Sequence, residues 1–418
     1  MPGDLYLGLD VGTSGARALV MDAAGAELAS AKAAMADFGP NLRDPEIWWQ
    51  AACRAVQGAL AQVDRNRIVA LAVDGTSGTM LAVDAAGMPL ADGVMYNDVC
   101  TDTAILDSIA AHAPRTSAAL GPTSGLARAL VLQASGPARL LHQADWIAWH
   151  FSGQMVSDAN NALKTGYDPV AGEWPGWIAA TGLDPALLPD TVEPGTPVGH
   201  ITAAAAALFG LSPHTQVIAG TTDGCASFLA TGAALPGDGV TAIGTTLTLK
   251  ILSDRPIFAP EHGIYSHRIL GMWLAGGASN SGGAALLAHF TAADMAALTP
   301  MLTPAQPTGL AYYPLPKPGE RFPIADPALP SRVSPRPASD ATFLQALFEG
   351  IAGIEALGYA RLAELGAPAL RGVRSLGGAA SNPAFTAIRS RTLNAPLQPA
   401  RSDEAALGAA LLAQRGAG

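Results

Sequence analysis

The hydrophobic positions at the start of the chain fall into short apolar runs separated by tight polar turns. Residues 5–10 (LYLGLD) and 16–22 (ARALVMD) flank a Gly-Thr-Ser-Gly tip, and residues 27–32 follow a further turn at Gly25. Apolar runs of this length joined by turns are typical of antiparallel strands. We therefore expect residues 5–32 to form three strands, the first two joined by a hairpin whose tip carries only small residues.

Beyond this region, helical and strand patterns alternate. An Asp-Pro-Glu start with Pro45 at an early helical position predicts a helix to about residue 62. The pattern is mostly helical and loop from about 100 to 190, and a buried strand returns at 214–224. A Pro-rich loop region at 300–340 precedes a long predicted helix from about 340 to 364. These alternations indicate an α/β protein.

The hairpin pattern at the N-terminus recurs twice. Residues 71–90 (LAVDGTSGTMLAVDAAGMPL) align with residues 7–28 when a short gap is allowed, which pairs Asp74 with Asp10. A third Gly-Thr turn lies in AIGTTLTLK at 242–250, again between apolar runs. Internal similarity of this kind suggests one supersecondary unit used more than once. Asp-Gly-Thr is also an ordinary hairpin composition, so the middle copy alone does not decide between the two interpretations.

The first and third tips have the chemistry that a polyphosphate requires. A tip of small residues offers backbone N–H groups and hydroxyls without bulk. We therefore expect the chain to hold a nucleotide between two similar halves. The expected phosphate contacts are Thr13, Ser14 and Gly15 at one tip and Gly244, Thr245 and Thr246 at the other.

Composition narrows the classes of partner and compartment. With 418 residues and 49% hydrophobic content, the chain should form about two to three domains. A net charge of −10 without a Lys/Arg run argues against nucleic acid or an anionic membrane. Three widely spaced cysteines without CxxC indicate neither a disulfide framework nor a zinc site, as expected in a reducing cytoplasm. No signal peptide or membrane-spanning stretch is visible.

Two aspartates stand at the ends of predicted strands. Asp10 directly precedes the first tip, where a carboxylate can hold a hydrated Mg²⁺ against phosphates. Asp223 follows the apolar run VIAGTT and precedes a predicted helix. A carboxylate there could accept a proton from an attacking hydroxyl, or it could cap the helix, and the two roles are compatible.

Two further polar clusters have both a functional and a structural interpretation. Asn382, in the segment LGGAASN, could bond a purine edge or cap the helix that begins at Pro383. Tyr96, Asn97 and Asp98 could grip sugar hydroxyls or form an ordinary Asn-Asp turn. His142, His267 and His289 show no metal-ligand spacing and are expected to be structural or surface residues.

Taken in order, five motifs resemble those of the FGGY family of carbohydrate kinases, and the resemblance covers nearly the whole chain. The sequence LGLDVGTSGARALVMD is similar to the first phosphate motif, VIAGTTDGCASFLATGA to the segment with the catalytic aspartate, and AIGTTLTLK to the second phosphate motif. GGASNSGGAALLAHF resembles the family's second signature, and SLGGAASNPAFTAIRSRTLNAPL resembles its adenosine motif.

The resemblance implies an α/β fold of two actin-like ATPase (ribonuclease H-like) domains with ATP and sugar in an interdomain cleft. The domains would span residues 1–228 and 229–401, with a C-terminal helix at about 402–418 packed back on the first. It implies ATP and Mg²⁺, with Asp223 as general base and Asp10, through water, and Asp223 near the metal. Sugar contacts would come from Asp10, Ser77, Asp98 and Asp223, and nucleotide contacts from the two tips together with Gly377, Gly378, Ala379 and Asn382.

Departures from the family's usual motifs bear on the substrate. The Gln-Arg-Glu typical of glycerol kinases and the Gln-Met-His of xylulokinases are both absent from residues 75–79, and the usual Trp-x-Asp-x-Arg is Tyr96-Asn97-Asp98-Val99-Cys100 here. The chain is most similar to the short D-ribulose kinase group of cyanobacteria and plants. We therefore expect a monomeric or homodimeric cytoplasmic kinase that acts on a ketopentose, most specifically D-ribulose.

Three alternatives remain open from the sequence. One is a D-xylulose or pentitol kinase of the same family. Another is an actin- or chaperone-type ATPase coupled to a protein partner, for which the sequence shows no interaction segment after the adenosine motif. The last is a sugar sensor without turnover, which the presence of both Asp10 and Asp223 disfavours.

Overall fold

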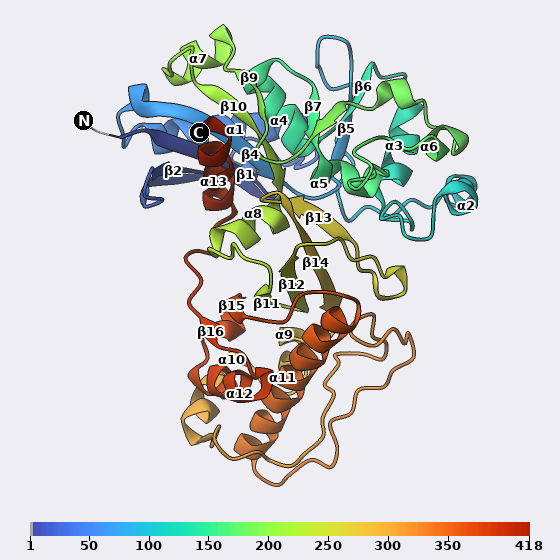
Figure 1. Ribbon diagram of the computed structural model, residues 1–418, viewed down its shortest axis with the longest axis vertical. Helices are drawn as coiled ribbons and strands as arrows, with labels where there is room; N and C mark the ends of the chain where they lie inside the picture. Colours follow the sequence, from blue (N-terminus) through green and yellow to red (C-terminus); the bar gives the residue numbers. More distant parts are fainter. Residues whose placement is uncertain (1–2) are drawn as a thin grey trace. The chain divides into compact units, whose positions relative to one another are not determined.

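The computed structural model describes residues 3–418, apart from the side chains of residues 379 and 380. The chain divides into two compact units (Figure 1). The first unit comprises Met1–Ala230, His267–Gly271 and Glu404–Gly418, and the second comprises Thr231–Ser266 and Met272–Asp403. The mixture of helices and sheets in each unit confirms the expected α/β class.

The first unit is built on a six-stranded sheet. Its strand order is β3-β2-β1-β4-β10-β9, in which β1 pairs antiparallel with β2 and parallel with β4, and β4 pairs parallel with β10. The three N-terminal strands and their hairpin are therefore confirmed. The strands are β1 (Leu5–Val11), β2 (Gly15–Asp22), β3 (Glu27–Ala34), β4 (Ile68–Gly75), β9 (Pro197–His200) and β10 (Gln216–Thr222).

Two helices pack on opposite faces of this sheet. The predicted helix at Pro45 is α1 (Pro45–Leu60), capped by the Asp44 side chain, and its apolar residues join Leu7 and Leu9 in one core. Because side chains alternate across a strand, Gly8 faces the other side. There α13 (Ala405–Ala417) approaches so closely that a Cβ on Gly8 would lie 1.9 Å from the Ala406 carbonyl oxygen.

The middle hairpin expected from the internal repeat is wrong. β4 is followed by β5 (Met80–Val83), but β5 leaves the main sheet and pairs antiparallel with β6 (Arg139–His142). Residues on both faces of β4 and β5 are buried, so their sequence carries no alternation that would specify a partner. The turn at 75–78 therefore redirects the chain instead of closing a hairpin.

Short elements complete the first unit around β5 and β6. A second small sheet pairs β7 with β8 in parallel. The remaining elements are α2 (Thr103–His112), α3 (Gly125–Gln133), α4 (Gln143–Ser152), β7 (Val156–Asp158), α5 (Ala159–Ala162), α6 (Trp177–Ala180), β8 (Asp190–Val192), α7 (Ala203–Phe209) and α8 (Asp223–Ala230).

The second unit has a sheet in which the third Gly-Thr turn forms the predicted hairpin. β11 (Asp238–Ile243) pairs antiparallel with β12 (Leu247–Ser253) and parallel with β15 (Gly372–Leu376). The predicted long helix is α11 (Asp340–Glu364), which packs in the apolar core of this unit. The other elements of this unit are β14 (Met272–Ser279), α9 (Gly283–Leu287), α10 (Ala292–Leu298), α12 (Pro383–Leu393) and β16 (Leu397–Gln398), whereas β13 (Ser266–Ile269) falls mostly in the His267–Gly271 segment of the first unit.

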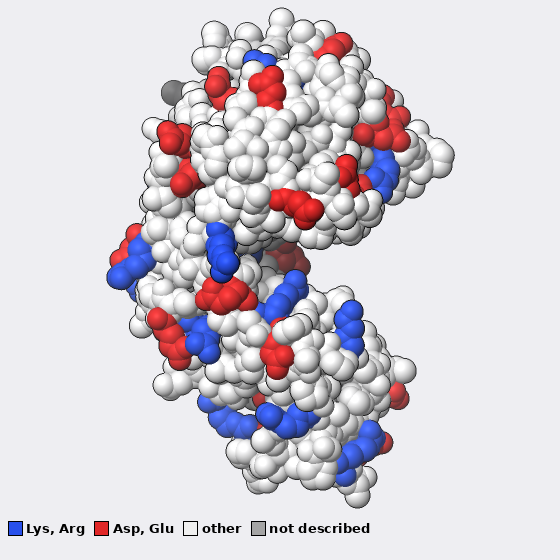
Figure 2. Space-filling model, turned by 90° about the vertical axis from the view of Figure 1, so that its right-hand side faces the viewer, with Lys and Arg blue, Asp and Glu red and all other residues white. Residues whose placement is uncertain are grey.

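The surface shows no large field of one charge on the face displayed in Figure 2, where Lys and Arg alternate with Asp and Glu over a mostly uncharged surface. Within residues 3–418, no helix is both long enough and apolar enough to cross a membrane.

Candidate active site

Three aspartates meet at the carboxyl ends of neighbouring parallel strands in the first unit. Asp10 on β1 is the register partner of Asp74 on β4. Asp223 begins α8 directly after β10, whose Thr221 is the register partner of Asp74 on its other side. Because β1, β4 and β10 run in the same direction, their ends place three carboxyl groups at one edge of the sheet.

Burial and mutual repulsion set the protonation of this cluster. Asp74 is fully buried, and its pKa lies well above the usual range, first because of burial and then because of the neighbouring Asp10 and Asp223. Burial also raises the pKa of Asp10, while a hydrogen bond with Asp74 and the charge of Arg17 oppose that shift. Neither oxygen of Asp74 meets an N–H or O–H donor among the described residues. Burial and the adjacent carboxylate of Asp10 therefore favour the protonated form of Asp74.

Asp10 and Asp223 are the less buried members of the cluster. Asp223 is half-buried at the N-terminus of α8, and its Oδ1 accepts a hydrogen bond from its neighbour's amide, Gly224 N, at 2.6 Å. Nowhere in the described part of the chain do three or more His, Cys, Asp or Glu side chains form a group that could hold a metal ion. Two carboxylates at this edge, Asp10 and Asp223, are oxygen ligands of the kind that a hydrated Mg²⁺ would accept.

The first tip presents an exposed loop directly beyond Asp10. Gly12 N donates to Gly15 O at 2.9 Å and closes the turn. Thr13 and Ser14 are exposed, so their hydroxyls and amides can face a ligand. The second tip, in the other unit, joins Ile243 to Leu247 and likewise exposes its residues 244 and 245.

The second signature packs directly against that second tip. Gly283 N, at the start of α9, donates to Gly244 O at 2.8 Å. A Cβ at position 283 would lie 2.7 Å from the same oxygen, so only glycine allows this approach.

A cavity of about 490 Å³ in the second unit brings two of the predicted nucleotide motifs together. Gly244 and Thr245 of the tip line it together with Gly378 and Asn382, more than 130 residues later in the sequence. Its remaining wall is largely apolar, as suits a flat base. Thr246 and Gly377 do not line it, and Ala379 lies in a short 3-10 helix (Gly378–Ser381) but its side chain is outside the described part of the structure. The other lining residues are Ile243, Gly283, Leu286, Leu287, Ala292, Met295, Ala296, Phe348 and Ser381.

Asn382 uses both ends of its amide inside the protein. Its Oδ1 accepts from Phe385 N at 3.0 Å and caps α12, and its Nδ2 donates to Thr299 Oγ1 at 2.8 Å. Of the two interpretations of this residue, the helix cap is the one that the structure shows.

The residues expected to contact sugar differ in how they are engaged. The Ser77 Oγ is buried and meets no hydrogen-bond partner within residues 3–418. The Asp98 carboxylate is paired with Arg43 through both oxygens and also accepts from Met95 N at 2.8 Å. The Arg43 guanidinium accordingly lowers the pKa of Asp98. Asp98 therefore anchors its own loop, and its contact with sugar stays a prediction.

Two buried side chains beside the turn at residues 75–78 were not identified from the sequence. Gln143, at the start of α4, accepts hydrogen bonds at its Oε1 from Thr76 N at 3.3 Å and from Thr76 Oγ1 at 2.9 Å. These bonds hold the turn at residues 75–78 in place. Arg128, on α3, is 2% exposed and donates to backbone carbonyls at Met95, Tyr96 and Asp98. Both residues lie dozens of positions away in the sequence from the turn that they contact. The only sequence signal was a charged residue, Arg128, within the apolar run LARALVL.

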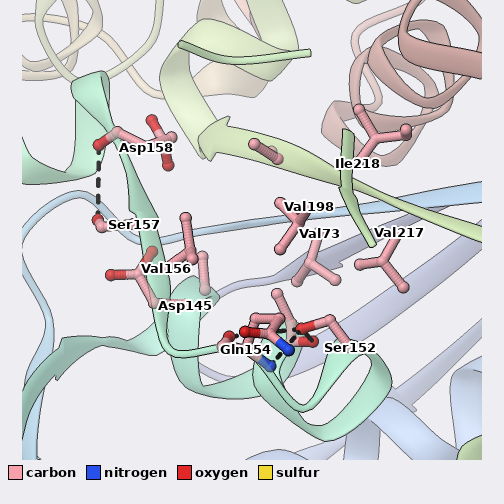
Figure 3. Close-up of a pocket in the computed structure, with 14 residues that line it drawn as sticks. Val73, Asp145, Ser152, Gln154, Val156, Ser157, Asp158, Val198, Val217 and Ile218 are labelled. Carbon is pink, nitrogen blue, oxygen red and sulfur yellow. Dashed lines mark hydrogen bonds between the residues drawn. The ribbon is translucent and has the colours of Figure 1, made fainter. Parts of the chain in front are cut away.

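His142 is a structural residue, as expected, and belongs to a buried hydrogen-bond network. Its Nδ1 lies 2.7 Å from Asp145 Oδ2 and its Nε2 lies 3.0 Å from Thr165 Oγ1. Asp145 and Asp158 line a neighbouring cavity of about 20 Å³, walled by valines and by Ile218 (Figure 3). Burial, followed by the charge of Asp145, raises the pKa of Asp158 to about 7. A space of this size has room for a water molecule but not for a sugar.

Comparison with known proteins places these features in one family. Residues 5–118 match the N-terminal domain, and residues 239–417 the C-terminal domain, of the FGGY family of carbohydrate kinases. An autoinducer-2 kinase of Yersinia enterocolitica is 27% identical over 460 residues, which cover 100% of this chain and 87% of the relative. A xylulose kinase of Streptomyces rubiginosus is 27% identical over 283 residues, which cover 60% of this chain and 55% of that protein.

Solved structures show the same fold. A crystal structure described as a xyloylose kinase from Brucella ovis has a TM-score of 0.87 at 23% identity and covers 99% of this chain and 90% of its own. A xylulose kinase from Rhodospirillum rubrum has a TM-score of 0.82 at 22% identity, with coverage of 98% and 89%. The two sheet-containing units, the ordered motifs and both matched domains thus establish that this chain belongs to the FGGY family of carbohydrate kinases, phosphotransferases that act on a sugar hydroxyl.

Proposed function

We propose that this kinase transfers the γ-phosphoryl group of ATP, with Mg²⁺, to the terminal hydroxyl of an open-chain ketopentose, D-ribulose. The observation that carries the proposal is the cluster of Asp10, Asp74 and Asp223 at three parallel strand ends. The raised pKa of Asp74 favours its neutral form, which leaves Asp10 and Asp223 to act on a hydrated cation and on a proton.

Each residue has a distinct role in the proposed reaction. Asp223 accepts the proton of the terminal hydroxyl as its oxygen bonds to the γ-phosphorus and the bond from phosphorus to the ADP oxygen breaks. Asp10 would hold a hydrated Mg²⁺, whose charge would offset that of the phosphates. Asp74 donates its proton to Asp10 and so fixes the orientation of that carboxylate.

Nucleotide contacts are assigned to both tips and to the cavity of the second unit. Thr13, Ser14 and Gly15 at one tip, and Gly244, Thr245 and Thr246 at the other, would bind phosphates. The cavity beside Gly378 has the size and apolar wall that a purine nucleoside needs. Gly377 and Ala379 adjoin this segment. We keep Asn382 as the cap of the adjoining helix and assign it no contact with the base.

The choice of D-ribulose rests on the turn at residues 75–79, which lacks the arginine and glutamate typical of glycerol kinases. The relatives include xylulose and autoinducer-2 kinases, so both substrates belong in the test.

The experiment is an ADP-release assay of the purified protein with D-ribulose, D-xylulose, ribitol, glycerol, autoinducer-2 and no acceptor. D-ribulose should give a kcat/KM about tenfold or more above D-xylulose, and glycerol should be very poor. Preference for another acceptor would overturn the D-ribulose assignment. Equal ADP release with and without every acceptor would instead favour an ATPase coupled to a protein partner.

A further inference from the structure

Buried polar atoms without partners gather around the turn that follows Asp74. Among the residues that the structure describes, Ser77 Oγ, Arg128 Nη1 and Gln143 Nε2 are each buried and lack a hydrogen-bond partner. Unsatisfied buried groups are rare in folded proteins. Three of them at one turn therefore point to a ligand that supplies the missing partners.

Hydrogen bonds hold two nitrogens of the Arg128 guanidinium in place, and the third, Nη1, has no partner among the described residues. Its Nε donates to Met95 O at 2.9 Å, and its Nη2 donates to Tyr96 O and, at 3.2 Å, to Asp98 O. Its Nη1 points at the turn, where it would lie 3.2 Å from a Cβ placed on Gly78. Glycine at this position keeps the space in front of Nη1 open, and the φ of +95° at Gly78 is one that favours glycine.

The charges around Arg128 leave its guanidinium in need of an acceptor. The nearest carboxylate, Asp98, is already paired with Arg43 and hydrogen-bonded to Met95 N. The other cationic side chain near this turn is Lys164, whose Cδ would lie 4.0 Å from the same Cβ. A guanidinium has only donors, so the partner that fits Nη1 is an oxygen that accepts.

The turn and the carboxylate cluster belong to one site. Gly78 follows Asp74 by four residues, a distance of at most about 14 Å along an extended chain. Asp74 in turn interacts with both Asp10 and Asp223. We therefore place the far end of a small linear substrate, whose reacting end lies at Asp223, beside this turn.

We infer that Arg128 Nη1 donates a hydrogen bond to the carbonyl oxygen of the sugar and so makes this kinase select ketoses over the corresponding alditols. The inference rests on the proposed function, because it concerns the same sugar site. A carbonyl oxygen accepts but cannot donate, which matches a donor-only partner, and a charge-assisted hydrogen bond to it is stronger than a neutral one. An alditol offers a hydroxyl whose own proton must then find another acceptor.

The experiment measures kcat and KM for D-ribulose and ribitol in the wild type, Arg128→Met and Arg128→Lys. Arg128→Met should lower the ratio of kcat/KM for ketose over alditol by about tenfold or more, and Arg128→Lys should retain part of the preference. Because Arg128 also holds residues 95–98, Arg43→Gln is the matched control. It removes the other anchor of this loop without touching Nη1, so it should lower both activities and leave their ratio unchanged.

Gly78→Ala provides a second approach if Arg128 variants do not fold. Its methyl group would block Nη1, so it too should reduce the ketose preference. Because alanine at a φ of +95° also strains the backbone, Gly121→Ala, at the same φ and with nothing within 4 Å of its Cβ, is the control and should leave the ratio unchanged. An unchanged ratio in the folded Arg128 or Gly78 variants, or the same loss in Arg43→Gln, would overturn the inference. In those cases turnover of D-ribulose would still support the proposed function, whereas a wild type inactive on every ketose would overturn both.

Discussion

Asp10 on β1 and Asp74 on β4 are register partners on two parallel strands, and burial together with the neighbouring Asp10 carboxylate raises the pKa of Asp74 well above its usual range. The two residues are therefore unequal, although the sequence presents them as members of one repeat. Asp74 is fully buried, which raises its pKa well above the usual range, while Asp10 is half-buried and the charge of Arg17 opposes the rise of its pKa.

This inequality predicts different effects of the same substitution. Asp74→Asn should retain activity within about tenfold, because an amide is neutral and can still donate to Asp10. Asp10→Asn should reduce phosphoryl transfer by at least about a hundredfold, since it removes the charge that orients the water shell of Mg²⁺. Activity measured against Mg²⁺ concentration checks both variants. Equal losses in the two would show that the proton does not reside on Asp74.

Asp223→Asn should leave ATP binding nearly intact and reduce kcat by about 10²- to 10⁴-fold, the usual contribution of a positioned general base. Its strand-end position supports this role, although it also begins α8. ATP affinity by calorimetry and turnover of D-ribulose separate the two roles. A variant with nearly normal kcat and a lower melting temperature would show that Asp223 serves the helix alone.

Asn382→Ala should cost about 1 kcal/mol of stability, the typical loss for an N-cap, and leave the ATP-to-GTP preference unchanged. Both polar ends of the Asn382 amide are engaged, with Phe385 N and with Thr299 Oγ1. Unfolding in urea and kinetics with both nucleotides provide the measurements. A changed base preference at unchanged stability would restore Asn382 as a contact for the purine.

The raised pKa of Asp158 leads us to expect that the free energy of unfolding depends on pH up to about neutrality. Its pKa is raised from 3.8 to about 7 in the folded protein, so the folded state binds its proton more tightly than the unfolded chain. The stabilisation is complete below about pH 4 and is lost as pH rises through about 7, by up to about 4 kcal/mol. Asp158→Asn should flatten this part of the profile relative to the wild type. Parallel profiles for both proteins would contradict the assignment.

Local patterns predicted the parts of the fold that neighbouring residues determine. The hairpin of β1 and β2, the start of α1 at Pro45 and the full length of α11 follow from turn residues, caps and periodicity. The partner of β5 did not follow, because Met80 to Val83 are buried on both faces and their register partners lie 56 or more residues later.

In the candidate site, too, the sequence predicted the residues that belong to local motifs and did not predict the contacts between distant segments. Asp10 and Asp223 were found because each ends an apolar run beside a recognisable motif. The pairing of Asp98 with Arg43 spans 55 residues, and Arg128 acts on residues about 30 positions earlier, so neither relationship leaves a local trace. The proton on Asp74 depends on burial and on two other strands, which no single segment of sequence encodes.

The C-terminal helix α13 has a consequence for how the protein is made. It lies against β1, with Gly8 under Ala406, and against α8, where a Cβ on Gly408 would lie 1.9 Å from Ala226 O. Contacts between residues about 400 positions apart must form before the first unit is complete, and such distant pairings slow folding. During synthesis, β1 therefore cannot complete its packing until α13, about 400 residues later in the sequence, has been translated.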